Sequence, residues 1–123
     1  MTQETQIYVQ PPAPRLTARP GYELLAAILD EALAQAQDGK GRERHAGPGE
    51  AFHDQQIVQL GEWMGGSTAF AIGQACKKAL ESTRLSDDRA VGELLGAIDY
   101  IAAAVIVIRR RPGAAGGALE ARR

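Results

Sequence analysis

One apolar stripe, between Ser86 and Arg111, constrains the fold of this chain more than any other feature of its sequence. The stretch reads SDDRAVGELLGAIDYIAAAVIVIRRR. Its apolar side chains recur at steps of three and four residues, the spacing that places side chains on one face of an α-helix. They are Val91, Leu94, Leu95, Ile98, Ile101, Ala102, Val105 and Ile108. The stripe predicts a long helix with a continuous apolar face.

The ends of this predicted helix carry residues that are typical of helix termini. Ser86 can cap the first turn, Asp87 and Asp88 follow it, and three arginines precede Pro112 at the other end. Acidic groups favour the positive N-terminal end of the helix dipole and basic groups favour the C-terminal end. We therefore expect the helix to run from Ser86 to Arg111, where Pro112 and the glycine after it stop it.

A second face of the same helix carries small residues. Gly92, Gly96, Asp99, Ala103 and Ile106 follow one another at three- and four-residue steps. Because glycine inside a helix costs about 1 kcal/mol relative to alanine, this face predicts the close approach of another backbone. We expect an interface between subunits there, with the helix at the centre of the fold. Asp99 would then be buried beside a cationic partner, or else exposed at a gap in the bundle.

The remaining sequence predicts an all-α bundle of three or four helices in which the C-terminal helix is central. Apolar residues recur at helical spacing from Gly21 to Asp38, from Asp54 to Met64 and from Ser67 to Arg84. The expected divisions are an extended arm over residues 1–20, a helical domain over 21–111 and a disordered tail over 112–123.

Composition limits the classes of function that are open to this chain. The 123 residues are 45% hydrophobic and 5% aromatic, which favours one small helical domain. A net charge of -1 argues against non-specific binding of nucleic acid. The apolar run from Tyr100 to Ile108 is shorter than the roughly 20 residues of a membrane span, so none is expected. One cysteine and the lack of a signal-like N-terminus favour a cytoplasmic location.

The candidate binding residues are cations in and after the polar stretch from Gly39 to Asp54. This stretch reads GKGRERHAGPGEAFHD and is predicted to be a loop by its glycines and its proline. Cationic groups beside flexible backbone suit a phosphate or a carboxylate. The predicted patch joins the loop residues Lys40, Arg42, Arg44 and His45 to the helical residues Lys77, Lys78 and Arg84. The alternative is a set of separate surface pairs with Glu43, Glu50 and Glu81.

The sequence contains no recognisable catalytic or metal-binding motif. The GxxxxGK[ST] phosphate loop is absent, and His45 and His53 do not have the spacing of zinc ligands. Cys76 lies on an apolar helical stripe, where an inert buried thiol is expected. Trp63 is expected to anchor the core or an interface. We therefore expect no metal and no cofactor.

One family of enzymes shows a loose similarity. The chain resembles the all-α nucleotide pyrophosphohydrolases of the MazG kind in its acidic-headed apolar helix, from Glu93 to Asp99, and in an earlier helix that bears Glu23, Asp30 and Glu31. This resemblance implies a Mg²⁺-dependent hydrolase. The ExxE and ExxD spacings of the family are missing, and Glu93 and Asp99 lie roughly 600° apart around the helix, so they do not face one ion. The enzyme is therefore the alternative hypothesis.

The sequence from Tyr22 to Ile108 also resembles small all-helical proteins encoded by bacteriophages and prophages. The resemblance rests on GKGRERH, on Phe52, Gln55 and Ile57, on GQACKK and on ELLGAIDYIAAAVIVI. It implies an intracellular accessory role and carries over no ligand or catalytic residue. Our main hypothesis is a non-enzymatic homo-oligomer that binds a nucleotide-like anion or an acidic protein surface. A purely structural assembly protein is a further alternative.

Overall fold

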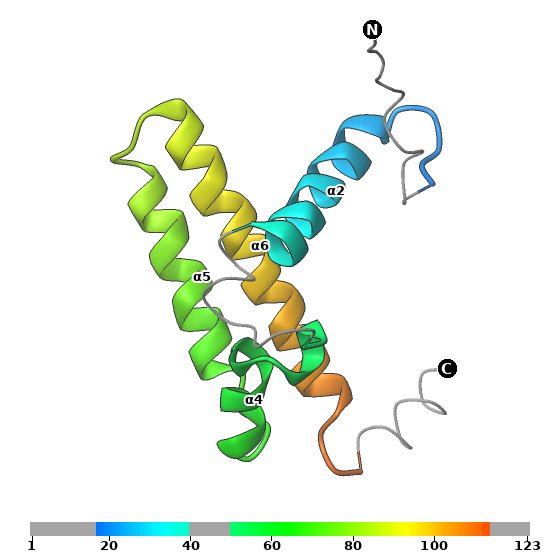
Figure 1. The fold of residues 1–123 in the computed structure, drawn as a ribbon, viewed down its shortest axis with the longest axis vertical. Coiled ribbons are helices and arrows are strands. Elements are labelled where there is room, and N and C mark those ends of the chain that lie inside the picture. Colours follow the sequence, from blue (N-terminus) through cyan, green and yellow to red (C-terminus); the bar gives the residue numbers. More distant parts are fainter. Residues whose placement is uncertain (1–16, 40–49, 114–123) are drawn as a thin grey trace, which may run out of the picture.

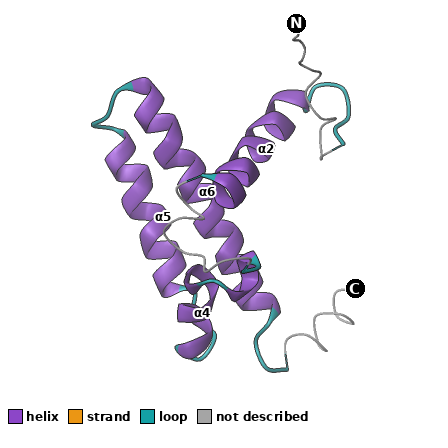
Figure 2. Cartoon of the chain, viewed as in Figure 1, coloured by secondary structure: helices purple, strands orange, loops and turns teal. Residues whose placement is uncertain are grey.

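The structure is a computed structural model that describes residues 17–39 and 50–113, and within these ranges it is helical and has no strand. Figures 1 and 2 show the helices and their order. The elements are α2 (Glu23–Asp38), the 3₁₀ turn η1 (Phe52–Asp54), α4 (Gln56–Trp63), α5 (Ala69–Ser82) and α6 (Asp87–Arg109). The prediction of an all-α fold with three or four helices is confirmed. Most of the predicted arm and nearly all of the predicted tail lie outside the described residues.

The helix termini differ from the predictions in detail. α6 begins directly after Ser86, as predicted, but the Ser86 side chain makes no capping hydrogen bond. Its carbonyl instead accepts the first helical N–H, from Ala90, at 2.8 Å. α4 begins after Gln55 rather than after Asp54, because Asp54 belongs to the 3₁₀ turn. Beyond α6, Gly113 has a φ of 82°, a conformation that glycine adopts at little cost and that turns the chain off the helix axis.

The buried core lies where α4 and α5 pack against α6. It consists of Ile57, Val58, Ala71, Ala75, Ala97, Tyr100, Ala103, Ala104 and Val107. Many of these residues are alanines, so the helix axes come close together. A close contact occurs at Gly61, where an added Cβ would lie 2.7 Å from the Ser67 carbonyl oxygen and 2.9 Å from Val107 Cγ2. At Gly92 an added Cβ would meet nothing within 4 Å, and at Gly96 it would meet only side chains, so no other backbone among the described residues approaches these two glycines.

The two apolar faces of α6 are buried to different extents. The large side chains at Val91, Leu94, Ile101, Val105 and Ile108 remain between 40% and 50% exposed. On the small-residue face, by contrast, the chain itself buries two of the five residues, Gly96 and Ala103. Residues of the same chain therefore cover these two positions, and the predicted subunit interface on this face stays a prediction.

Two side chains are exposed, namely Cys76, which we expected to be buried, and Trp63, which we expected in the core or in an interface. Cys76 lies on the open side of α5, so it is not the buried thiol that the apolar spacing suggested. Trp63, at the end of α4, is 69% exposed and is not part of the core. Both helices bury alanine, glycine and small β-branched residues against α6, as at Ala71, Ala75 and Gly61.

α2 contacts α6 through its C-terminal half and leans away from the α5–α6 pair (Figure 1). Ala32 is buried, and Gln35 Nε2 donates a hydrogen bond to the Gly92 carbonyl at 3.2 Å. The N-terminal half of the same helical face carries Leu25 and Leu29, which remain exposed. This half of α2 extends beyond the packed part of the chain.

By length and composition, α6 could cross a lipid bilayer. About a third of its most apolar part is buried inside the chain, and core helices of soluble proteins can pass the same test. The short run from Tyr100 to Ile108 is therefore not sufficient to exclude a span.

Candidate functional site

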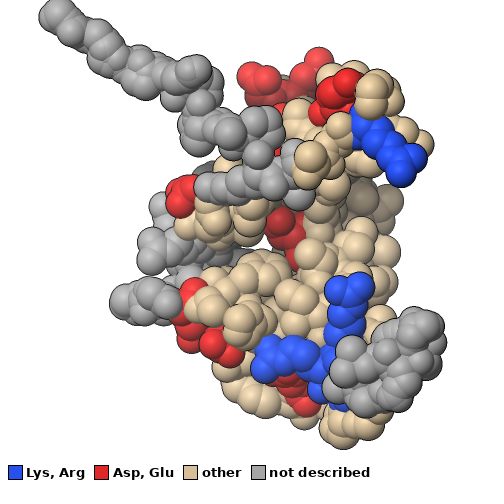
Figure 3. All heavy atoms as spheres, turned by 90° about the vertical axis from the view of Figure 1, so that its right-hand side faces the viewer, with Lys and Arg blue, Asp and Glu red and all other residues tan. Residues whose placement is uncertain are grey.

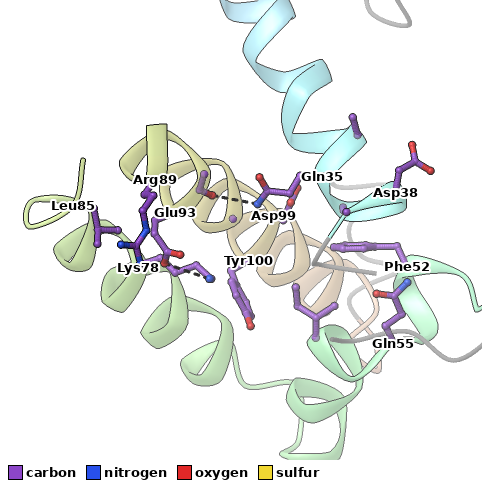
Figure 4. A pocket seen from close by; sticks show the side chains of 16 residues that line it. Gln35, Asp38, Phe52, Gln55, Lys78, Leu85, Arg89, Glu93, Asp99 and Tyr100 are labelled. Carbon is purple, nitrogen blue, oxygen red and sulfur yellow. Dashed lines mark hydrogen bonds and ion pairs between the residues drawn. The ribbon is translucent and has the colours of Figure 1, made fainter. Parts of the chain in front are cut away.

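A cleft of about 670 Å³ opens between the C-terminal half of α2, the η1 turn and the side of α6 (Figure 4). We call it the α2–α6 cleft. Its polar side chains are Gln35, Asp38, Gln55, Lys78, Arg89, Glu93 and Asp99. Phe52 and Tyr100 add aromatic surface. A concave site of this size with a few converging polar groups is typical of a small-molecule binding site.

Two side-chain amides hold the walls of the cleft in place. The Gln35 amide joins α2 to the backbone of α6 through its bond to Gly92. Gln55 is buried, and its Nε2 donates to the Glu50 carbonyl at 3.3 Å. Because a buried amide without a partner would cost free energy, these bonds fix the positions of α2 and of the segment before α4.

Lys78 is fixed by groups of its own chain. Its Nζ lies 3.5 Å from Glu93 Oε1 and 5.9 Å from the centre of the Tyr100 ring. Tyr100 is itself held by an edge-to-face contact with Phe70, at 6.1 Å between ring centres. The aliphatic part of Lys78 covers Gly96, where an added Cβ would lie 3.1 Å from its Cδ. The charge of Lys78 is therefore largely neutralised before any ligand enters.

Asp99 is the least compensated polar group of the cleft. It is half-buried beside Gln35 (Figure 4), and no hydrogen bond or ion pair within the described residues reaches its carboxyl group. Burial raises the pKa of this carboxyl to about 7, because the charged form loses hydration. The cationic partner that we predicted for Asp99 is not found in this part of the chain. Near neutral pH the group is therefore divided between its charged and neutral forms.

Of the three predicted cations that lie among the described residues, one lines the cleft. Lys78 lines it, whereas Lys77 and Arg84 do not, and Arg84 pairs with Glu81 at 2.6 Å on the surface. The loop residues lie outside the described residues; they are Lys40, Arg42, Arg44 and His45. Sequence reasoning missed Arg89, although its spacing to Glu93 and Gly96 places it along the same side of α6.

Charge balance within the described lining does not favour an anion. Two cations, Lys78 and Arg89, face three carboxyl groups, those of Asp38, Glu93 and Asp99. One cation is already paired to Glu93. Apart from this pair, the described lining holds one cation, Arg89, and the carboxyl groups of Asp38 and Asp99, so it has no excess of positive charge.

Neither the described residues nor the comparisons with known proteins assign a chemical reaction to the cleft. In residues 17–39 and 50–113, no three His, Cys, Asp or Glu side chains are grouped so that they could hold a metal ion. The resemblance to Mg²⁺-dependent hydrolases thus gains no support from this part of the chain. No protein-family model matches the sequence, and no curated protein or solved structure matches it either.

Proposed function

We propose that this protein is a non-enzymatic binding protein whose α2–α6 cleft takes a small organic molecule with a protonated amine. The observation that carries the proposal is the Asp99 carboxyl, which lines the cleft and has no partner within the described residues. Removing a carboxylate from water is costly unless an opposite charge or a hydrogen-bond donor replaces the water. A ligand amine beside Asp99 would supply both.

The rest of the lining suits the body of such a ligand. Tyr100 and Phe52 provide flat apolar surface, and Glu93 adds a second carboxyl on the same helix. The anionic partner expected from the sequence would instead depend on loop cations outside the described residues. The phage-related accessory role and the cytoplasmic location stay predictions.

Binding of an amine should strengthen as the pH rises through neutrality. With its pKa near 7, the Asp99 carboxyl is mostly neutral at pH 6 and mostly charged at pH 8. An amine pairs with the charged form and must displace the proton of the neutral form. If the amine binds only the charged form, its apparent affinity should rise about tenfold over this interval.

The test compares three probes of the same size and different charge, namely benzylamine, benzyl alcohol and benzoate. Calorimetric titration at pH 6 and pH 8 should show the tightest binding for benzylamine and the pH dependence given above. Asp99→Asn should abolish the preference for the amine. Asp38→Asn is the matched control, because it removes a carboxylate from the exposed rim of the same cleft.

Two results would refute the proposal. One is tighter binding of benzoate or a nucleotide than of benzylamine, with no dependence on Asp99. The other is release of phosphate from nucleotides in the presence of Mg²⁺, which would support the hydrolase. Native mass spectrometry of the purified protein would add an independent view, since a retained molecule identifies itself by its mass.

A further inference from the structure

The exposed face of α6 has the regular spacing of a coiled-coil seam. Its large apolar residues follow one another at steps of 3, 4, 3, 4 and 3; they are Val91, Leu94, Ile98, Ile101, Val105 and Ile108. Five of them are between 40% and 50% exposed, and Ile98 is partly exposed. We call these six residues the α6 stripe. They stay exposed although α6 contacts α5, α2 and α4.

We propose that two copies of this chain pair through the α6 stripe, with the two α6 helices antiparallel. A repeat of 3.5 residues keeps one apolar seam against a partner helix, whereas a helix that packs on a globular core typically has a wider and less regular stripe. Val91, Ile98 and Val105 alternate along the seam with Leu94, Ile101 and Ile108, so every core position of the repeat is aliphatic. The seam is therefore complementary to a copy of itself.

The charges at the two ends of α6 favour the antiparallel arrangement. Asp87 and Asp88 lie exposed at its N-terminus, and Arg109 lies exposed at its C-terminus. Within the described residues none of the three has an ion-pair partner, whereas Arg110 already pairs with Glu62 at 3.1 Å. An antiparallel pair brings acidic ends to basic ends, and a parallel pair would bring like charges together.

The surface shows the same tendency, although both signs of charge occur at each end. α6 runs from the upper to the lower end of the molecule in Figure 1. In Figure 3 acidic side chains predominate at the upper end, and most of the Lys and Arg side chains in this view lie near the lower end, with acidic side chains beside them. A twofold axis midway along the stripe, between Ile98 and Ile101, would set Val91 opposite Ile108 of the partner subunit and so match every large residue.

The area of the stripe is of the size that a dimer requires. At the observed exposures the six side chains offer on the order of 500 Å² of apolar surface, using typical areas for aliphatic residues. The flanks of the helix and its charged ends would add to this. A standard interface buries about 800 Å² on each partner, so a pair of α6 helices approaches that value.

A bilayer is a less suitable cover for the stripe, although α6 is long and apolar enough to cross one. α6 carries Glu93 and Asp99, and it packs against α5, which exposes Lys77. The irregular turn at Gly65 and Gly66 lies between α4 and α5, beside the C-terminal end of α6. Polar side chains and irregular backbone are not tolerated where they face lipid, so insertion would require α4 and α5 to leave α6.

The first experiment separates the stripe from exposed apolar surface in general. Ile101→Lys places a charge beside the twofold axis, where the two copies would repel each other. Ile72→Lys is the matched control, because Ile72 is 44% exposed on α5 and lies outside the stripe. Light scattering over a micromolar concentration series should show dimers for the wild type and Ile72→Lys, and monomers for Ile101→Lys with unchanged helical circular dichroism. A wild-type monomer throughout, or a dimeric Ile101→Lys, would overturn the proposal.

The second experiment tests the direction of the helices. In a Cys76→Ser background, Val91→Cys and Ile108→Cys are prepared separately and then mixed under mild oxidation. Antiparallel pairing predicts disulfides between the two variants, and disulfides between two Val91→Cys chains would refute it. Sedimentation with phosphatidylcholine vesicles tests lipid as the alternative cover. If the wild type binds the vesicles and Ile101→Lys does not, lipid covers the α6 stripe and the proposed dimer is wrong.

Discussion

Replacing Asp99 with asparagine should stabilise the fold above neutral pH and have less effect near pH 4. Burial in the cleft raises the pKa of this carboxyl from 3.8 to about 7. The folded state therefore holds a proton that the unfolded state has released between these two values. The free energy of unfolding falls as the pH rises through this window and is level above it. Asparagine has a similar shape and no charge, so it removes this loss.

The size of the effect follows from the difference in pKa. A rise in the pKa from 3.8 to about 7 can lower the free energy of unfolding by at most about 4 kcal/mol. Asp99 is only half-buried in an open cleft, where water screens the charge, so we expect roughly 1 to 2 kcal/mol at pH 8. In a domain of this size, that is an increase of roughly 5 to 15 °C in the melting temperature.

Urea unfolding of both proteins at pH 4.5 and pH 8, at equal protein concentration, measures this difference. Asp38→Asn is the control, since Asp38 is exposed and should show no comparable dependence on pH. If Asp99→Asn raises the free energy of unfolding equally at both pH values, the ionisation of Asp99 is not the cause of the increase. A loss of stability at pH 8 would show that the carboxylate makes a favourable bond in the folded protein.

Three further predictions concern Gly61, Gly73 and Cys76. Gly61→Ala should destabilise the fold by about 1 to 3 kcal/mol in urea unfolding, because its Cβ would meet the Ser67 carbonyl oxygen. Gly73→Ala should stabilise it by up to about 1 kcal/mol, since Gly73 is helical and has open space around it; equal effects of the two changes would contradict this packing. Cys76 should react with a thiol reagent in the folded protein, and protection until unfolding would contradict its exposure.

The helices themselves were predictable because local signals agreed. Apolar spacing, Ser86 before α6 and Gly39 after α2 fix the elements to within a few residues. The buried face of α6 was not predictable in this way. Periodicity gives weight to large apolar side chains, whereas close packing against α5 and α4 selects small ones such as Ala97 and Ala104. Both faces satisfy the helical period, so only tertiary contacts distinguish them.

The cleft was predictable only in part. The spacing of Gly96 and Asp99 identified the small-residue face of α6, part of which lines the cleft. Lys78 was among the candidate binding residues. Its other wall comes from Gln35, which lies 57 residues before Gly92 in the sequence, and no local pattern reports such a contact. The cationic patch was inferred from the density of charges along the chain. That density does not reveal that Arg84 is paired with Glu81 on the surface.

The glycines of α6 are explained better by the cleft than by a helix interface. Gly92 and Gly96 both line it, and an added Cβ at Gly92 would meet nothing within 4 Å. No neighbouring backbone therefore requires glycine at Gly92, although glycine costs about 1 kcal/mol there relative to alanine. The missing side chain at Gly92 instead leaves open space at the wall of the cleft. α6 thus packs on its own chain through small residues such as Ala97, Ala103 and Ala104, and its large aliphatic residues remain exposed on another face, where we propose that a second copy binds.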